Sequence, residues 1–219
     1  LGKTLLVRTL ARQLPEGIRP FVRLVFPQMS PEQLLAYLAE ELTGGSSPES
    51  STDRNLRRVA SFLADNCRHG RHAVLVIEEA HVLKDSATLE TVRLLMNFEH
   101  ESTPAMTVML VGQPSLLPAL RRIPELEERL DAKCLLHRFT LEESISYIQH
   151  RLNAAGARRP IFEEAAMEAV HHLAQGTPRR INRLGDLALL LGYAEELRQI
   201  APKHIEALAE EMLVPAGGD

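Results

Sequence analysis

Residues 73–81 read AVLVIEEAH, which is five apolar residues followed directly by two glutamates. An unbroken apolar run of this length is typical of a strand buried on both faces, as parallel strands covered by helices are. Glu78 and Glu79 then stand at the carboxyl end of the strand, where open α/β sheets bind their ligands. The stretch therefore predicts a parallel sheet whose functional edge carries two carboxylates. The alternative is a solvated acidic strand end.

Two further runs have the length of strands. Residues 106–111 read MTVMLV and lead into Gly112 and Gln113, and residues 21–26 lie between two prolines. A glutamine at the tip of a strand beside the acidic one can hydrogen-bond a phosphate or an attacking water. The alternative is that Gln113 only caps the next helix.

Helix starts are marked by local signals. Capping boxes at Ser30-Pro31-Glu32-Gln33 and at Thr140-Leu141-Glu142-Glu143 each predict a helix. Further helices are expected from Asp85 and at about residues 162–174, 178–197 and 202–213, and residues 43–53, rich in Gly, Ser and Pro, are expected to form a surface loop. Because strand signals stop at about Thr140, an α/β domain should be followed by a helical one.

The chain begins LGKT, and Gly2, Lys3 and Thr4 match the second half of a phosphate-binding loop, G-x-x-x-x-G-K-[ST]. In such a loop the glycine lets backbone N–H groups wrap the phosphates, the lysine reaches the β and γ phosphates, and the hydroxyl binds Mg²⁺. Leu5 then begins an apolar helical pattern. The alternative is an exposed tripeptide near one end, because three residues are a weak match.

The two glutamates supply what a phosphate-binding GKT requires. In a nucleoside triphosphatase the first acid holds Mg²⁺ through its water shell and the second polarises the attacking water. Glu78 and Glu79 would take these parts.

A third candidate feature is the helix start at residues 176–183, which read GTPRRINR. Proline at the first helical position places Arg179 in the first turn, where the helix dipole disfavours a cation. An anion opposite Arg179 would explain this placement. The alternative is a basic, exposed helix start.

Composition excludes several classes of protein. With 219 residues, 45% hydrophobic and 25% charged, the chain has the make-up of a soluble globular protein, and its formal charge of -4 gives no overall basic field for nucleic acid. Cys67 and Cys134 form no CxxC pair, which argues against a disulfide framework or a structural zinc site. No apolar run has the length of a membrane span. We therefore expect a cytoplasmic chain, whose longer parent could be anchored in the inner membrane.

Four motifs occur in one order: GKT at 2–4, VLVIEEAH at 74–81, MLVGQP at 109–114 and GTPRRINRL at 176–184. This order resembles the AAA+ ATPases of the ExeA/GspA type, cytoplasmic ATPases associated with type II secretion and related to TniB-like ATPases. The resemblance covers nearly the whole chain. It implies an α/β P-loop NTPase domain over residues 1–137, with a parallel sheet and helices on both faces, and a small all-helical lid domain over 138–219.

The resemblance also implies roles for single residues. It assigns Gly2, Lys3, Thr4 and Leu5 to the Walker A loop, Thr4 and Glu78 to Mg²⁺, Glu79 to the catalytic base, Gln113 to sensor 1 and Arg179 to sensor 2. Arg129 becomes the candidate arginine finger that reaches the ATP of a neighbouring protomer. Its rivals are Arg121, Arg122 and Arg138.

The chain departs from the family in two places. Members usually have aspartate at the position of Glu78, and the longer side chain could shift the Mg²⁺ water shell and lower turnover. The strand before the phosphate-binding loop and the first glycine of Walker A are also absent. We expect from this that the chain is a fragment, or that the missing part is supplied or unrecorded.

The resemblance implies an ATPase that binds ATP and Mg²⁺, acts as a ring or other oligomer, and drives conformational work in the assembly of a secretion or pilus system with envelope proteins. A first alternative is a DNA-directed ATPase of the transposition type, similar to TniB, whose ring grips duplex DNA. A second is a slow nucleotide-gated scaffold in which Glu78 has reduced hydrolysis.

Overall fold

The computed structural model describes residues 2–45, 51–83 and 86–213. The chain divides into two compact units, of which one spans Thr4–Lys133 and the other joins the first three residues to the chain from Cys134 onward. The assignment of residues 1–137 and 138–219 as functional domains stays a prediction. Asp85, the predicted start of a helix, lies outside the described residues.

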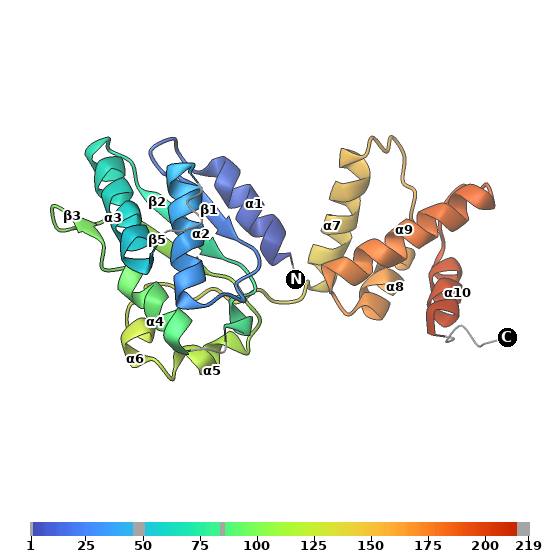
Figure 1. The fold of residues 1–219 in the computed structure, drawn as a ribbon. Helices are drawn as coiled ribbons and strands as arrows, with labels where there is room; N and C mark the ends of the chain where they lie inside the picture. The colour runs from blue at the N-terminus through green and yellow to red at the C-terminus, as the bar shows by residue number, and fades with distance from the viewer. Residues whose placement is uncertain (1, 46–50, 84–85, 214–219) are drawn as a thin grey trace. The chain divides into compact units, whose positions relative to one another are not determined.

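The first unit alternates helices and strands (Figure 1). Its elements are α1 Lys3–Gln13, β1 Phe21–Leu24, α2 Pro31–Thr43, α3 Thr52–Arg68, β2 Ala73–Ile77, the short 3-10 helix η1 Ala80–Val82, α4 Ser86–Leu95, β3 Glu99–His100, β4 Thr103–Pro104, β5 Met106–Leu110, α5 Leu116–Leu120 and α6 Pro124–Glu127.

Among the described residues, three parallel strands form the main sheet, in the order β1-β2-β5, and β3 and β4 pair as a separate antiparallel sheet. Phe21 pairs with Val74, and Ala73 pairs with Met106. All five residues of the central strand β2 are buried, as its apolar run predicts. The predicted strand over residues 21–26 is shorter, because the Leu24 carbonyl accepts the last ladder bond from the Glu78 N–H, 2.8 Å away, before the β2 chain turns away.

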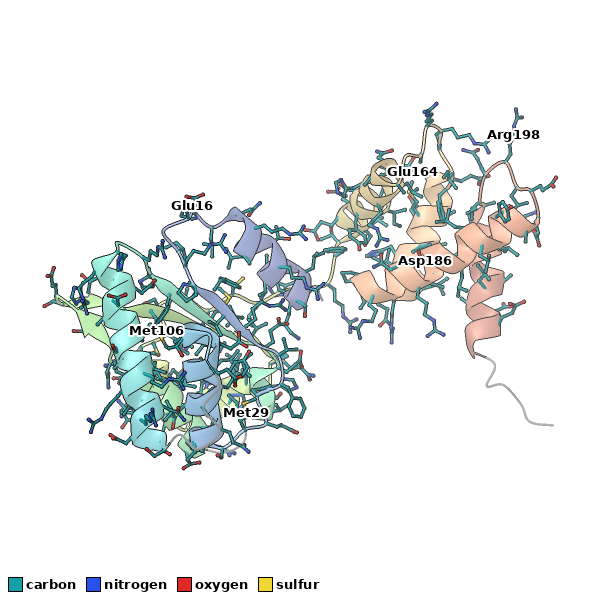
Figure 2. All side chains as sticks on the ribbon, turned by 45° about the horizontal axis from the view of Figure 1, so that its top comes forward. Glu16, Met29, Met106, Glu164, Asp186 and Arg198 are labelled. Carbon is teal, nitrogen blue, oxygen red and sulfur yellow. The ribbon has the colours of Figure 1, made fainter. Side chains whose placement is uncertain are left out.

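Side chains of β2 alternate between two apolar cores. Val74 and Val76 pack with Val7 of α1 on one face of the sheet. Leu75 and Ile77 face the other core, to which α2 and α3 also contribute. Figure 1 shows α1 on one side of the sheet and α2 and α3 on the other, and Figure 2 shows Met106 inside this unit, where it is buried. The predicted parallel sheet with helices on both faces is confirmed.

Both predicted capping boxes are present. The Ser30 hydroxyl accepts from the Gln33 N–H while the Gln33 side chain accepts from the Ser30 N–H, and Thr140 and Glu143 make the same exchange. Each exchange satisfies two backbone donors that a helix start would otherwise leave open. These two helices therefore begin where the local sequence predicts.

Helix α3 is an unpredicted element. The expected loop over residues 43–53 includes the last residue of α2 and the first two of α3, and Ser51 caps α3 by accepting from the Arg54 N–H. The buried stripe of α3 mixes apolar and polar side chains and consists of Asn55, Val59, Leu63 and Asn66. The apolar residues Val59, Leu63 and Cys67 recur every four residues and pack on the core. Asn66 is also buried, and its amide donates to the Arg19 carbonyl at 2.8 Å.

The second unit is helical. It contains α7 Leu141–Ala154, α8 Glu164–Ala174, α9 Pro178–Ala194 and α10 Pro202–Leu213. These helices follow the predicted ranges, except that α9 ends at Ala194 rather than near residue 197. Their core includes Ile148, Val170, Ile181, Leu184 and Ile205. Charged residues such as Glu164, Asp186 and Arg198 lie on the outside of this unit (Figure 2). Within the part of the chain that the structure describes, no helix is both long and apolar enough to cross a membrane.

Candidate functional site

The carboxyl end of β2 carries a buried glutamate that is fixed by partners from two other elements. The Thr4 hydroxyl, in the first turn of α1, donates to Glu78 Oε2 at 2.9 Å. Arg23 of β1 donates to Glu78 Oε1 through Nε at 3.0 Å and also through Nη2. Glu78 is only 3% exposed. The structure thus joins two predicted site residues, Thr4 and Glu78, and adds Arg23.

Strand register explains why these side chains meet. Arg23 stands opposite Val76 in the parallel ladder, and side chains alternate between faces, so Arg23, Val76 and Glu78 share the face covered by α1. Val7 of α1 packs against this face and places Thr4, one turn earlier on the helix, beside the end of the strand. The site therefore follows from the packing of α1 on β1 and β2.

The surroundings of Glu78 keep its carboxylate charged. Burial alone raises the pKa of Glu78, but hydrogen bonds from Arg23 and Thr4, together with the positive charges of Arg23 and Arg8, outweigh burial and lower it. The carboxylate is ionised at neutral pH and is available as an oxygen ligand.

The donor set at this site fits Mg²⁺, which prefers carboxylate and hydroxyl oxygens. Thr4 and Glu78 provide one oxygen of each kind, 2.9 Å apart. Gly2 has a φ of +87°, a conformation that favours glycine, and Lys3 begins α1. The GKT motif therefore does stand at a helix N-terminus, where backbone N–H groups attract anions. Leu5, also assigned to the loop, is exposed.

Glu79 differs sharply from its neighbour. Its backbone is left-handed, with a φ of 51°, and its side chain is 47% exposed. The nearest ionisable partner is His81, whose Nδ1 lies 3.5 Å from Glu79 Oε2; this buried Nδ1 has no hydrogen-bond partner among the described residues. A non-glycine residue in this backbone region costs free energy and often marks a functional site. Glu79 is thus accessible and only loosely held.

The end of β5 lies at the same sheet edge. The Val111 N–H donates to the Ile77 carbonyl, and the Ala80 N–H donates to the Val111 carbonyl, both at 2.9 Å. A Cβ on Gly112 would stand 3.0 Å from the His81 backbone nitrogen, which is a tight contact, so the close approach at this edge favours a glycine. Gln113 follows directly, and its side chain is exposed.

The alternative interpretation of Gln113 accounts only for its backbone. The Gln113 carbonyl accepts from the Leu116 N–H at 2.9 Å, which begins α5. This bond leaves the side-chain amide exposed at the strand edge. Its assignment to sensor 1 stays a prediction.

The arginine-finger candidates lie in different surroundings. Arg129 follows α6 and is exposed, as are Arg121 and Arg122. Arg138 belongs to the helical unit, where its guanidinium donates to Gln175 Oε1 at 3.3 Å. That bond gives Arg138 a structural partner within its own unit, while the role of Arg129 stays a prediction.

Arg179 lies in the first turn of α9, as the sequence predicts, and is exposed. The turn before it is fixed by Gly176, whose φ is +63° and whose carbonyl accepts from the Phe139 N–H at 2.9 Å. A Cβ on Gly176 would overlap the Phe139 carbonyl oxygen. Asn182, one turn further along α9, accepts from Tyr147 and Arg151 of α7. Much of the GTPRRIN motif therefore holds the start of α9 in place.

Arg23 is the site residue that the motifs do not identify. It stands between Val22 and Leu24 in a short strand that is otherwise apolar. A charged residue inside such a strand needs a partner, because an unpaired buried charge is costly. This signal is present in the sequence, but it does not name Glu78 as the partner.

A family profile described as AAA domain matches residues 1–120, which is more than half of the chain. The chain belongs to the AAA domain family. This AAA domain protein is also 30% identical over 214 residues to General secretion pathway protein A of Aeromonas hydrophila. The match covers 96% of the chain and 39% of that relative, so the chain spans well under half of its length. The predicted resemblance to ATPases of the ExeA/GspA type is confirmed.

Two solved structures with a similar fold are an ORC2 protein and a RuvB motor. The ORC2 protein of Aeropyrum pernix, in ADPNP-ADP complexes, matches with a TM-score of 0.73 and 14% identity, over 99% of this chain and 60% of that one. The RuvB Holliday junction branch migration motor of Thermotoga maritima matches with a TM-score of 0.62 and 19% identity, over 97% and 58%. At these identities the likeness shows the fold, which is that of P-loop AAA+ ATPases.

Proposed function

We propose that the chain binds ATP with Mg²⁺ at the carboxyl end of β2 and hydrolyses it. The observation that carries this proposal is the 2.9 Å contact between the Thr4 hydroxyl and Glu78 Oε2. It joins the hydroxyl of the GKT motif to the first acid after the buried strand. A nucleoside triphosphatase needs these two oxygens on the same metal site.

Each residue at this edge has a proposed part. Gly2, Lys3 and Leu5, at the N-terminus of α1, bind the phosphates, and Thr4 and Glu78 hold Mg²⁺. When bound, Mg²⁺ would neutralise phosphate charge and orient the phosphates for attack. Glu79 accepts a proton from the attacking water, a part that suits its exposed carboxylate. Gln113 hydrogen-bonds that water or the γ-phosphate.

Two exposed arginines complete the proposed mechanism. Arg179 senses the γ-phosphate from the helical unit, and Arg129 reaches the nucleotide of a neighbouring copy of the chain. Hydrolysis then depends on oligomerisation, because a finger supplied in trans is worth about 10³-fold or more in rate. The mechanical output is movement of the helical unit against the α/β unit.

The similarity to General secretion pathway protein A supports a role in the assembly of a secretion or pilus system. In such an assembly the chain would act on envelope proteins. It would be located at the cytoplasmic side of the inner membrane. ATPase rates measured with and without duplex DNA at two salt concentrations test this role. Strong stimulation by DNA that weakens with salt would favour a DNA-directed ATPase instead.

The catalytic part of the proposal is tested with Glu79→Gln. Glutamine keeps the size of the side chain but cannot take a proton, so ATP binding should persist while phosphate release falls by roughly 10²- to 10⁴-fold. Glu16→Gln is the matched control, because Glu16 is an exposed glutamate after α1 (Figure 2). Retained phosphate release in Glu79→Gln would remove Glu79 as the base.

A further inference from the structure

The Arg23–Glu78 pair divides the two oxygens of one buried carboxylate between different partners. Both bonds from Arg23, through Nε and Nη2, reach Oε1, whereas the Thr4 hydroxyl reaches Oε2. Oε2 is therefore the oxygen on the side of the GKT motif, and Oε1 is taken by the guanidinium.

Arg23 is itself held in place. Its backbone lies in the β1–β2 ladder opposite Val76, and its carbonyl accepts from the Tyr37 hydroxyl of α2 at 3.0 Å. Its side chain is only 26% exposed. The guanidinium thus approaches Glu78 from a fixed strand rather than from a mobile loop.

The geometry of a guanidinium matters for a glutamate at this place. Glutamate has one more rotatable bond than aspartate, so a buried glutamate needs more partners to hold one carboxylate orientation. Two N–H groups of the rigid guanidinium converge on Oε1 and fix the position of that oxygen, whereas the ammonium of lysine would act as a point charge.

We propose that Arg23 is a positioning residue for the metal site: it holds Oε1 of Glu78 and so turns Oε2 toward Thr4, where the cation binds. This inference rests on the proposed function. It adds that the arginine of β1 makes a glutamate usable as a metal ligand at the end of β2. Arg23 acts through Glu78 and does not touch the nucleotide.

The test compares nucleotide affinity in Mg²⁺ with affinity in EDTA, using a fluorescent, non-hydrolysable ATP analogue and the full-length protein. The ratio of the two affinities is the metal-dependent gain. In Arg23→Gln this gain should fall by roughly 10- to 100-fold, as is typical when a residue that supports a metal ligand is removed, while affinity in EDTA stays within about twofold of wild type.

Two further variants sharpen the test. Arg23→Lys keeps the positive charge but should still lose most of the metal-dependent gain in affinity. If Arg23→Gln does not fold, Arg23→Lys is measured in its place. Arg93→Gln is the matched control, because Arg93 also donates through Nε and Nη2 to a glutamate, Glu90, on α4. Its metal-dependent gain should equal that of wild type.

A double-mutant cycle with Glu78→Gln separates positioning from direct contact. If Arg23 acts through Glu78, the double variant should lose no more of the gain than Glu78→Gln alone. Three results would each overturn the role of Arg23: a metal-dependent gain equal to that of wild type in both Arg23 variants, additive losses of this gain in the double-mutant cycle, or a loss of nucleotide affinity in EDTA as large as the loss in Mg²⁺. Absence of nucleotide binding in wild type would instead contradict the proposed function, and the role of Arg23 with it.

Discussion

The end of β2 and the start of α9 both present a charged side chain that we assign to nucleotide, yet they are built in opposite ways. At the end of β2 the side chain is fixed: Glu78 is buried and bonded by Thr4 and Arg23. At the start of α9 the backbone is fixed by the contact between Gly176 and Phe139, while the Arg179 side chain is exposed.

The difference matches the two proposed tasks. A metal ligand must hold one orientation before the cation arrives, because preorganisation spares the cost of ordering it during binding. An arginine that senses a γ-phosphate must reach out and withdraw as nucleotide changes. Hydrogen bonds to the side chain suit the metal ligand. A fixed backbone with an exposed side chain suits the arginine that senses phosphate.

Breaking the backbone contact should have the largest effect. In Gly176→Ala the new Cβ would overlap the Phe139 carbonyl oxygen at a position whose φ is +63°. We expect a loss of about 4 kcal/mol in the stability of the helical unit, at the upper end for single substitutions. Amide hydrogen exchange in α7, α8 and α9 measures this loss of stability helix by helix.

Gly156→Ala is the matched control for that loss. Gly156 also has a positive φ, of +91°, but a Cβ there would meet nothing within 4 Å. It should cost only the conformational strain, about 1 kcal/mol. Equal losses for the two variants would show that the contact with Phe139 does not hold the start of α9.

Breaking the side-chain pair should have a smaller, pH-dependent effect. Arg23→Gln leaves the Glu78 charge buried without its main partner, and we expect a loss of about 3 kcal/mol at pH 7 in the absence of nucleotide and metal. The folded-state pKa of Glu78 lies below the ordinary value of 4.5, so its stabilising contribution is present above that pH and is lost as pH falls through the folded pKa.

Urea unfolding at a series of pH values checks this prediction. The difference in unfolding free energy between wild type and Arg23→Gln should be constant near neutral pH. It should narrow as pH falls toward the folded-state pKa of Glu78 in wild type, which lies below 4.5. A gap that does not change with pH would mean that Arg23 stabilises the sheet by packing rather than through the Glu78 charge.

The sequence predicts those parts of the structure that depend on local signals. The run AVLVI is buried on both faces, and the capping boxes at Ser30 and Thr140 start their helices, because strand burial and helix capping are encoded within a few residues. Helix α3 carries a local signal too, because Val59, Leu63 and Cys67 recur every four residues, although its buried stripe also holds Asn55 and Asn66.

The motifs of the candidate site could be found in the sequence, but the contacts between their residues could not. Thr4 and Glu78 are identifiable from their motifs, whereas the link from Arg23 to Glu78 depends on strand register, which the local sequence does not specify. Gly176 also depends on a long-range contact, because a Cβ at this position would overlap the carbonyl oxygen of Phe139, thirty-seven positions away in the chain (176 minus 139). Long-range contacts of this kind become visible only in the folded chain.

The central claim is that Thr4 and the fixed carboxylate of Glu78 hold the metal of a bound nucleotide. The most direct test titrates the non-hydrolysable ATP analogue in Mg²⁺ and in EDTA for Glu78→Gln beside Glu79→Gln. We predict that Glu78→Gln loses the metal-dependent gain in affinity by roughly 10-fold or more while Glu79→Gln keeps it, since only Glu78 shares a contact with Thr4. A full gain in Glu78→Gln would contradict the account.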